Sequence, residues 1–242
     1  MKKGKASTRS IERLSIYRRV LIEHRDELGD SVFSHELAGI CQLTAAQVRR
    51  DLMLVGYSGN PNRGYDVHSL LSSIARYLDP TLAREVAIVG VGYLGRAIAK
   101  FLAGRAPKLH LAAAFDTSPM KIGTDFSGVT CHAVESMPKV IAELGIDLGI
   151  LTVPASAAQD VAMRMAAAGV TGILNFAPVV LHLPSRIYVE SIDMSVALGK
   201  VAFFAPPNPR RRRQGTKTSL LPTELAEDAP RHLPQLSRAL NL

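Results

Sequence analysis

Three glycines with the spacing G-x-G-x-x-G follow an apolar run near the middle of the chain. Gly90, Gly92 and Gly95 come directly after residues 86–89, a pattern typical of a buried parallel strand that turns into a helix. In such turns the first glycine permits the tight bend, the second lets a pyrophosphate approach the backbone, and the third lets the helix pack on its strand. The N–H groups and positive dipole end of that helix favour an anion. The predicted phosphate-binding residues are Gly90, Val91, Gly92, Tyr93, Leu94 and Gly95.

An acidic residue stands where the next strand of such a unit would end. The apolar run 109–115 finishes at Asp116, about twenty residues past the last glycine of the turn. A carboxylate at this point accepts a hydrogen bond from a ribose 2′-OH and repels a 2′-phosphate. The pattern therefore predicts binding of NAD(H) rather than NADP(H). The alternative is a glycine-rich turn that serves only the packing of helix on strand.

The elements that would position these residues alternate between strand and helix. After Asp116 we expect strands at Val129–Ala133, Asp147–Val153, Gly172–Asn175 and Ile187–Ile192. We expect helices at Met137–Leu144, from a Ser156 cap to Ala168, and at Met194–Phe204 after an Asp193 cap. This alternation predicts an α/β fold, a Rossmann-type doubly wound parallel sheet.

Ligands of such sheets lie at the carboxyl ends of the strands. The turns after the fourth and fifth strands are therefore expected to line the nicotinamide end of the cofactor site. Their residues are Thr152, Val153, Pro154, Asn175, Phe176 and Pro178.

The first eighty residues show a different pattern. Apolar residues recur at helical spacing over 10–23, Ser34 can cap a short helix through Ala38, and residues 39–43 form a turn. Thr44 and Gln47 have the spacing of a capping box that opens a further helix, whose core face carries Val48, Leu52 and Val55. Two helices joined by a short turn form a helix-turn-helix arrangement.

The outer face of the second helix predicts contact with DNA. Its first residues would meet base edges, and its arginines could bind phosphate or guanine. Residues 56–67 are rich in turn formers and are expected to form a β-wing. The predicted DNA-binding residues are Thr44, Ala45, Ala46, Gln47, Arg49, Arg50 and, in the wing, Arg63. The alternative is a surface helical hairpin with solvated arginines.

The net charge and the composition of the chain agree with binding of DNA and a nucleotide cofactor. The net charge is +8, and most of it lies at the two ends of the chain, which suits contact with a polyanion. No signal peptide or membrane-spanning run is evident, so we expect a cytoplasmic protein without a membrane partner. Cys41 and Cys131 lie in different predicted elements without metal-ligand spacing, and no metal site is predicted. If the protein senses redox state, a bound cofactor is a better candidate sensor than these thiols.

Over residues 10–205 the chain resembles the Rex family of redox-sensing transcriptional repressors. The matching segments share their order and spacing with that family. They are Arg13-Leu14 with Tyr17, residues 46–52, 64–67, the glycine turn, 114–116, 150–155, 168–179 and 191–193.

The resemblance implies a winged-helix DNA-binding domain (1–80) and an NAD(H)-binding domain with a domain-swapped C-terminal helix (81–205). The basic, Pro-rich tail (206–242) has no apolar period and is expected to be disordered. The resemblance implies a homodimer that binds double-stranded operator DNA when free or bound to NAD⁺ and releases it on binding NADH. It also implies that Arg19 pairs with Asp193 in the DNA-binding arrangement, and that Asp193 and Met194 approach the partner's nicotinamide pocket.

Two positions depart from the family pattern. The wing run Asn60–Tyr65 moves the usual basic residue and lacks one glycine, and Phe101 replaces a common tyrosine. The altered wing puts the operator preference in doubt. Phe101 lacks the hydroxyl group that could form a hydrogen bond in the NADH-driven change. The glycine turn that would bind the cofactor is intact.

Two other functions compete with a repressor. An NAD-dependent dehydrogenase with an N-terminal dimerisation domain would need an acid–base group. His110, His132 and His182 are the candidates, and only His182 could approach the nicotinamide. A CoA-binding module shares the glycine turn, but Asp116 and the helix-turn-helix argue against it. We therefore expect no catalytic residues.

Overall fold

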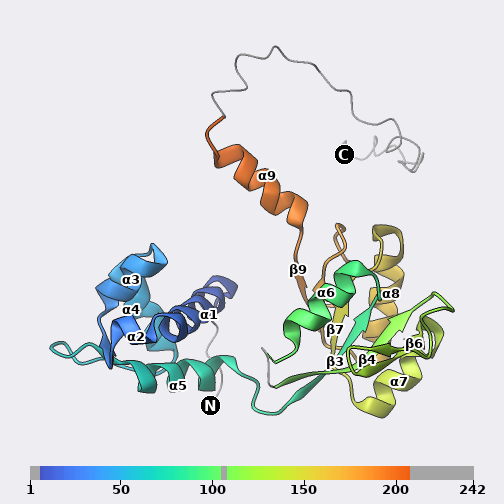
Figure 1. Cartoon of the computed structure of the whole chain (residues 1–242), viewed down its shortest axis with the longest axis horizontal. Coiled ribbons are helices and arrows are strands. Elements are labelled where there is room, and N and C mark those ends of the chain that lie inside the picture. The colour runs from blue at the N-terminus through green and yellow to red at the C-terminus, as the bar shows by residue number, and fades with distance from the viewer. Residues whose placement is uncertain (1–5, 105–107, 208–242) are drawn as a thin grey trace, which may run out of the picture. The chain divides into compact units, whose positions relative to one another are not determined.

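The computed structural model describes residues 6–104 and 108–207. Its N-terminal part is mainly helical (Figure 1). The elements are α1 (Thr8–Glu23), α2 (Arg25–Leu28), β1 (Ser31–Val32), α3 (Ser34–Cys41), α4 (Ala45–Leu54), β2 (Tyr65–Asp66) and α5 (Val67–Leu78). β1 and β2 pair antiparallel, so the chain after the wing returns beside the segment that precedes α3. This is the predicted winged helix-turn-helix arrangement.

Helices α1, α3, α4 and α5 enclose one apolar core. Leu14, Leu21, Leu52, Leu70 and Ile74 are fully buried in it. Val48 is also buried and Val55 packs against the cluster, as their spacing predicts.

Several local predictions in this part were wrong. Ser34 is the first residue of α3 rather than its cap, because the N–H of Phe33 donates to the Glu36 carboxylate (2.7 Å). The helix continues past Ala38 to Cys41, and the backbone changes direction at Gln42, where φ is +55°. The helix α5, opened by the Asp66 side chain, was not predicted.

Residues 84–191 form a seven-stranded sheet with helices. The elements are β3 (Arg84–Val89), α6 (Tyr93–Leu102), β4 (Leu109–Asp116), β5 (Asp125–Phe126), β6 (Val129–Ala133), a 3₁₀ turn at Val134–Ser136, α7 (Met137–Leu144), β7 (Leu148–Leu151), α8 (Ala155–Ala168), β8 (Gly172–Asn175) and β9 (Tyr188–Ser191). The strand order is β5-β6-β4-β3-β7-β8-β9. Only β5 runs antiparallel. The order reverses between β3 and β7, which places a ligand crevice at their carboxyl ends.

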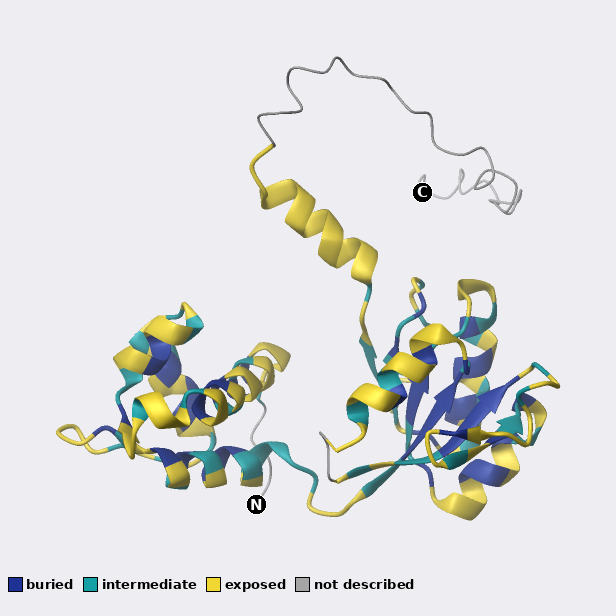
Figure 2. Ribbon diagram, in the orientation of Figure 1, coloured by how far each residue is buried: buried dark blue, intermediate teal, exposed yellow. Residues whose placement is uncertain are grey.

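Alternate residues of the strands face two separate cores. Val89, Phe115 and Leu151 pack with α7 and α8, whereas Ile88 and Ile150 belong to the core on the side of α6. The dark-blue strands in Figure 2 are these buried segments. The predicted doubly wound sheet is confirmed. Ser156, however, lies inside the first turn of α8, which follows Pro154 without a side-chain cap.

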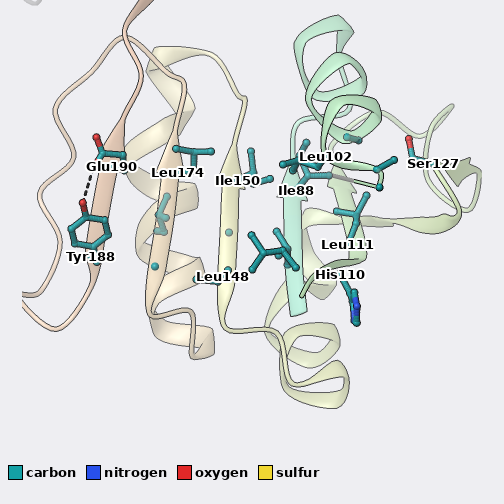
Figure 3. A pocket seen from close by; sticks show the side chains of 18 residues that line it. Ile88, Leu102, His110, Leu111, Ser127, Leu148, Ile150, Leu174, Tyr188 and Glu190 are labelled. Atoms are coloured by element: carbon teal, nitrogen blue, oxygen red, sulfur yellow. Dashed lines mark hydrogen bonds between the residues drawn. The ribbon is translucent and has the colours of Figure 1, made fainter. Parts of the chain in front are cut away.

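One face of the sheet carries an apolar groove. Residues of β3, β4, β7, β8, β9 and α6 line a hollow of about 550 Å³ (Figure 3). Leu111, Ile150 and Leu174 form part of its floor, and at one end the Tyr188 hydroxyl donates to Glu190 (2.6 Å). No helix lies between β8 and β9, so this face is less completely covered than the one under α7 and α8.

The last described element is α9 (Met194–Phe204), which has the predicted bounds. It forms a separate unit of the chain and has no buried residue. It is drawn in yellow throughout in Figure 2, although most of its side chains are apolar. Of the predicted tail, residues 208–242 lie outside the described residues. None of the helices in the described ranges is long and apolar enough to cross a membrane.

Candidate functional site

Two glycines of the turn between β3 and α6 are required by the protein's own packing. A Cβ on Gly90, where φ is +98°, would lie 2.5 Å from the carbonyl oxygen of Thr152. A Cβ on Gly95 would lie 2.2 Å from the carbonyl oxygen of Gly90. These are the tight bend and the close helix–strand contact that the sequence predicts.

Gly92 differs from both. It caps α6 at its amino end, is exposed, and a Cβ there would meet no heavy atom within 4 Å. Packing among the described residues therefore does not explain its missing side chain. Open space at the positive end of a ten-residue helix fits the approach of an anionic group.

Asp116 ends β4 beside this turn, with its side chain 10% exposed. One carboxylate oxygen, Oδ2, accepts from the N–H of Val91 (2.8 Å) and from Lys121 Nζ (2.9 Å), while Oδ1 accepts from the N–H of Ser118 (2.9 Å). Burial alone would raise the pKa of Asp116, but these hydrogen bonds outweigh it and hold the pKa below its ordinary value. The group is therefore an ionised acceptor at neutral pH.

Lys121 was not predicted to belong to the site. A signal was present in the sequence, since a basic residue follows the acid by five positions in a turn-rich stretch. Periodicity carries no information about such a contact, because residues 117–124 form turns without a repeating face.

The carboxyl end of β7 is tied to the glycine turn. The hydroxyl of Thr152 lies 2.8 Å from the carbonyl oxygen of Gly90 and 3.0 Å from that of Val89. Val153 and Pro154 follow and lead into α8. The structure thus brings the predicted Thr152 turn next to the glycine turn.

The turn after β8 is organised by Asn175, whose side chain is fully buried. Its amide nitrogen donates to the carbonyls of Ala177 and Val179 (both 3.1 Å), and its oxygen accepts from the N–H of Ala177 (2.9 Å). Asn175 therefore shapes the turn that carries Phe176 and Pro178. Pro178 is exposed and Phe176 is partly exposed.

In the N-terminal part, α4 presents the predicted basic face. Ala46, Arg49 and Arg50 are exposed, and the Thr44 hydroxyl caps the helix by accepting from the N–H of Gln47 (3.2 Å). Arg49 also donates to the hydroxyl of Ser34 (3.0 Å), which links α4 to α3.

The inner side of α4 carries a buried charge. Asp51, whose side chain is 1% exposed, accepts from the Arg13 guanidinium (2.6 and 2.8 Å), the Tyr17 hydroxyl (2.8 Å) and Gln47 Nε2 (3.0 Å). The Gln47 side chain therefore points to Asp51 and does not complete the predicted capping box. Burial would raise the pKa of Asp51, but the bonds from Arg13 and Tyr17 lower it below its usual range.

The wing ends in a tight turn. Asn60 and Gly64 form a β-bridge, and the Asn60 side chain accepts from the N–H groups of Asn62 and Arg63. Arg63 is exposed at its tip. Gly64 has φ of +73°, and a Cβ there would lie 2.6 Å from the carbonyl oxygen of Val32.

The last three predicted residues are those that the resemblance assigns to the dimer. Arg19 is exposed on α1, Asp193 directly precedes α9, and Met194 begins it. Their pairing across a dimer stays a prediction. Burial raises the pKa of both thiols, Cys41 in α3 and Cys131 in β6.

A helix-turn-helix domain and a dinucleotide-type sheet in one chain define a DNA-binding regulator that responds to a small ligand. Two family descriptions match parts of the chain: "Putative DNA-binding protein N-terminus" over residues 5–52 and "CoA binding domain" over 82–179.

Curated relatives match much more of the chain. The redox-sensing transcriptional repressor Rex of Roseiflexus sp. (strain RS-1) is 40% identical over 194 residues, covering 80% of this chain and 88% of that protein. The Rex repressor of Lactobacillus gasseri is 38% identical over 192 residues, 79% and 90% of the two chains. The chain belongs to the Rex family of redox-sensing transcriptional repressors.

Solved structures agree with this assignment. RSP, a Rex-family repressor in complex with β-NAD⁺ and operator DNA, aligns with a TM-score of 0.77 at 32% identity, covering 83% of this chain and 93% of that one. RSP in complex with β-NADH aligns with a TM-score of 0.74 at the same identity, covering 83% and 94%.

Proposed function

We propose that this protein represses transcription by binding operator DNA through α4 and the wing, and that NADH binding at the glycine turn releases the DNA. The observation that carries the cofactor assignment is Gly92, an exposed helix cap whose missing side chain has no packing reason. The RSP repressor, to which the chain is similar, has been seen with β-NAD⁺ and operator DNA together and, separately, with β-NADH.

The residues present fit a dinucleotide. The turn around Gly92 would accept the pyrophosphate, and Asp116 would accept the adenosine ribose hydroxyl. The turns at 152–154 and 175–178 would line the nicotinamide end. The bound group supplies the signal, because NADH and NAD⁺ differ by one hydride and one ring charge.

On the DNA side, Arg49, Arg50 and Arg63 are exposed on α4 and the wing. We assign the arginines to phosphate or guanine and the first residues of α4 to base edges. Gln47 is held by Asp51, so Thr44, Ala45 and Ala46 would present the helix start to the major groove.

The protein would act as a homodimer. A second copy's α9 would cover the apolar groove over β3, β7 and β8, since a sheet of this class needs helices on both faces. An apolar helix without a buried residue also requires a cover.

The link between the two functions would be the pair of Arg19 with Asp193 of the other copy. A ligand shifts an equilibrium only by its differential affinity for two states. A tenfold change in operator occupancy needs about 1.4 kcal/mol of coupling. Exchange of one ion pair, together with repacking of α9, suffices for that amount.

We further propose that the site binds its cofactor without turnover and that the protein acts in the cytoplasm, where bacterial operators lie. His182, the histidine placed best for acid–base chemistry, sits in a surface loop whose backbone is held by Gln159 on both its N–H and its carbonyl. This anchoring fits a structural role.

The test is binding to a fluorescent duplex that carries a candidate operator, titrated with NADH and separately with NAD⁺ at fixed salt. We expect release by NADH at far lower concentrations than by NAD⁺. Specific DNA binding that is indifferent to NADH would contradict the switch, with Phe101 and the altered wing as first suspects. Tight NADH binding without specific DNA binding would favour the dehydrogenase.

A further inference from the structure

One large apolar side chain stands on the outer face of α4. Met53 is 74% exposed, although Leu52 before it is fully buried and Val55 after it packs on the helical core. The core therefore does not account for the apolar side chain at this position. A single exposed methionine needs no explanation on an ordinary surface, so its significance depends on the residues around it.

The neighbours of Met53 on the surface of α4 are basic. Residues three, four and seven positions apart share one face of an α-helix. In α4 these positions hold Ala46, Arg49, Arg50 and Met53, and all four are exposed. Two guanidinium groups thus lie between two apolar side chains. A face with this charge favours DNA over an apolar protein surface as its partner.

The polar groups in the first turn of α4 are already engaged within the fold. The hydroxyl oxygen of Thr44 accepts from the N–H of Gln47 (3.2 Å), and Gln47 Nε2 donates to Asp51 Oδ1 (3.0 Å). Ala45 and Ala46 offer only methyl groups. Apart from its arginines, the side chains that α4 would turn toward bases are therefore mainly apolar.

An apolar side chain can distinguish one base from the others in the major groove. Thymine alone among the four bases presents a methyl group there, and an apolar side chain that packs on this group removes both surfaces from water. The thioether chain of methionine is flexible and polarizable, so it adapts to such a contact. From Ala46 to Met53 the helix rises about 10 Å, the length of about three base-pair steps. The two apolar ends of the face can therefore meet different base pairs.

We propose that Met53 is a specificity-determining residue of the DNA-binding face and packs on the methyl group of a thymine in the operator half-site. The proposal rests on the proposed function, because it assumes that α4 lies in the major groove. Arg49 and Arg50 bind phosphate or guanine, and Met53 selects a thymine about three base pairs from the pair that meets Ala46.

The test begins with duplexes that the full chain selects from a pool of random sequences, which supplies the operator without assuming it. In a fluorescent copy of the selected duplex, each thymine of one half-site is replaced in turn by deoxyuridine, which lacks only the methyl group. The readout is the ratio of the two dissociation constants, deoxyuridine over thymine, at fixed salt. At the thymine that Met53 contacts we expect a ratio of about four, which corresponds to about 0.8 kcal/mol, the transfer free energy of one methyl-sized group.

Three variants separate Met53 from other sources of this ratio. Met53→Ala should lower the ratio to about one at that thymine, because the contact is already lost. Met53→Leu keeps an apolar side chain and should keep the ratio near wild type. The matched control is Met163→Ala, which shortens another exposed methionine on α8 and should leave the ratio as in wild type.

The salt dependence distinguishes this contact from a charged one. Met53→Ala should weaken binding to the thymine duplex without changing the slope of log affinity against log salt, because an apolar contact releases no counterion. Melting temperatures identify any variant that is not folded.

The outcomes separate the two claims. A ratio near one at every thymine in wild type, or a ratio in folded Met53→Ala equal to that of wild type, overturns the assignment of Met53 and leaves the proposed function standing. Failure of the wild-type chain to select any specific duplex overturns both.

Discussion

The two folded regions of this chain place their buried polar groups in different positions. In residues 8–78 the carboxylate of Asp51 lies inside the helical core, held by groups from α1 and α4. Among the described residues of 84–191, the polar side chains that are buried are Asp116 and Asn175, and both stand at the carboxyl end of a strand. One region places charge at its centre, and the other keeps polar groups at the edge of the sheet where we propose that the dinucleotide binds.

The difference follows from what each region must hold fixed. Apolar packing is non-directional, whereas a set of hydrogen bonds to one carboxylate is directional. Asp51 therefore fixes how α4 sits on α1, which matters if α4 enters a groove of DNA as proposed. The sheet is already oriented by its backbone ladder, so its polar groups serve the turns at the strand ends, where Asn175 holds the turn after β8 and Asp116 holds the turns around Val91 and Ser118.

The largest expected effect comes from breaking the charged centre of the first region. Asp51→Asn leaves the Arg13 guanidinium without its ionised partner in a largely buried site. Removing one member of such a pair costs about 3 kcal/mol, near the lower end of the usual range because Arg13 keeps 20% of its side chain exposed. Chemical denaturation followed by circular dichroism measures the loss.

Asp26→Asn, an exposed position on α2, is the matched control and should change stability by less than about 0.5 kcal/mol. Measuring the free energy of unfolding at lower pH makes the test specific to the Asp51 carboxylate. Because the pKa of Asp51 is lowered in the folded state, its stabilisation is complete above the unfolded value of about 3.9 and is lost as pH falls through the folded-state pKa. The gap between wild type and Asp51→Asn should shrink only below about pH 4. A gap that shrinks already between pH 7 and 5 would contradict this role.

The second effect separates packing from ligand binding in the sheet region. Gly95→Ala forces a Cβ against the Gly90 carbonyl and should destabilise the fold by about 2 kcal/mol. Gly92→Ala adds a methyl group in open space, so stability should stay within about 0.5 kcal/mol of wild type while the dissociation constant for NADH rises at least tenfold. Thermal melts and calorimetric titration distinguish the two. Equal losses of stability would show that Gly92 also serves packing.

A smaller effect tests whether the two regions communicate. Asp193→Ala removes the proposed partner of Arg19 across the dimer. Because the pair belongs to the DNA-binding arrangement, its loss favours release, and we expect the NADH concentration needed for half-release of operator to fall about tenfold, which corresponds to about 1.4 kcal/mol. The duplex titration described above measures it, and NADH affinity without DNA serves as the internal control. An unchanged NADH response would eliminate the ion-pair account.

The smallest effect concerns individual DNA contacts. Arg50→Ala and Arg49→Ala should each weaken binding and reduce the slope of log affinity against log salt by about one, if each arginine meets a phosphate. Arg25→Ala on α2 offers an equal charge change outside the helix-turn-helix. A slope equal to wild type in both α4 variants would exclude phosphate contacts there.

Much of the sheet region could be predicted from residues alone. The bounds of β6, α7, β8 and α9 agree with the apolar periodicity, because in each the period changes sharply at a glycine or a polar residue. The glycine turn and Asp116 were also found, since they follow one another along the chain at fixed spacing.

The contacts between side chains could not be predicted from the sequence in the same way. Asp51 meets Arg13 across 38 positions, and only the packing of α1 on α4 brings them together. Gln47 was assigned to a cap because local spacing favoured it, but the buried carboxylate is a stronger acceptor. Lys121 was missed since its contact depends on a turn without periodicity. The helix α5 was missed although Asp66 and the apolar residues that follow carried its signal.

The two cysteines determine which kind of redox change this molecule can register. Peroxides and disulfides react with thiolates, and burial of Cys41 and Cys131 raises the pKa of each thiol, so both stay protonated at neutral pH. These two thiols should therefore react slowly with oxidants, which leaves the bound dinucleotide as the better candidate for the redox-sensing group. An oxidant would then change repression of the promoter indirectly, after metabolism had changed the ratio of NADH to NAD⁺.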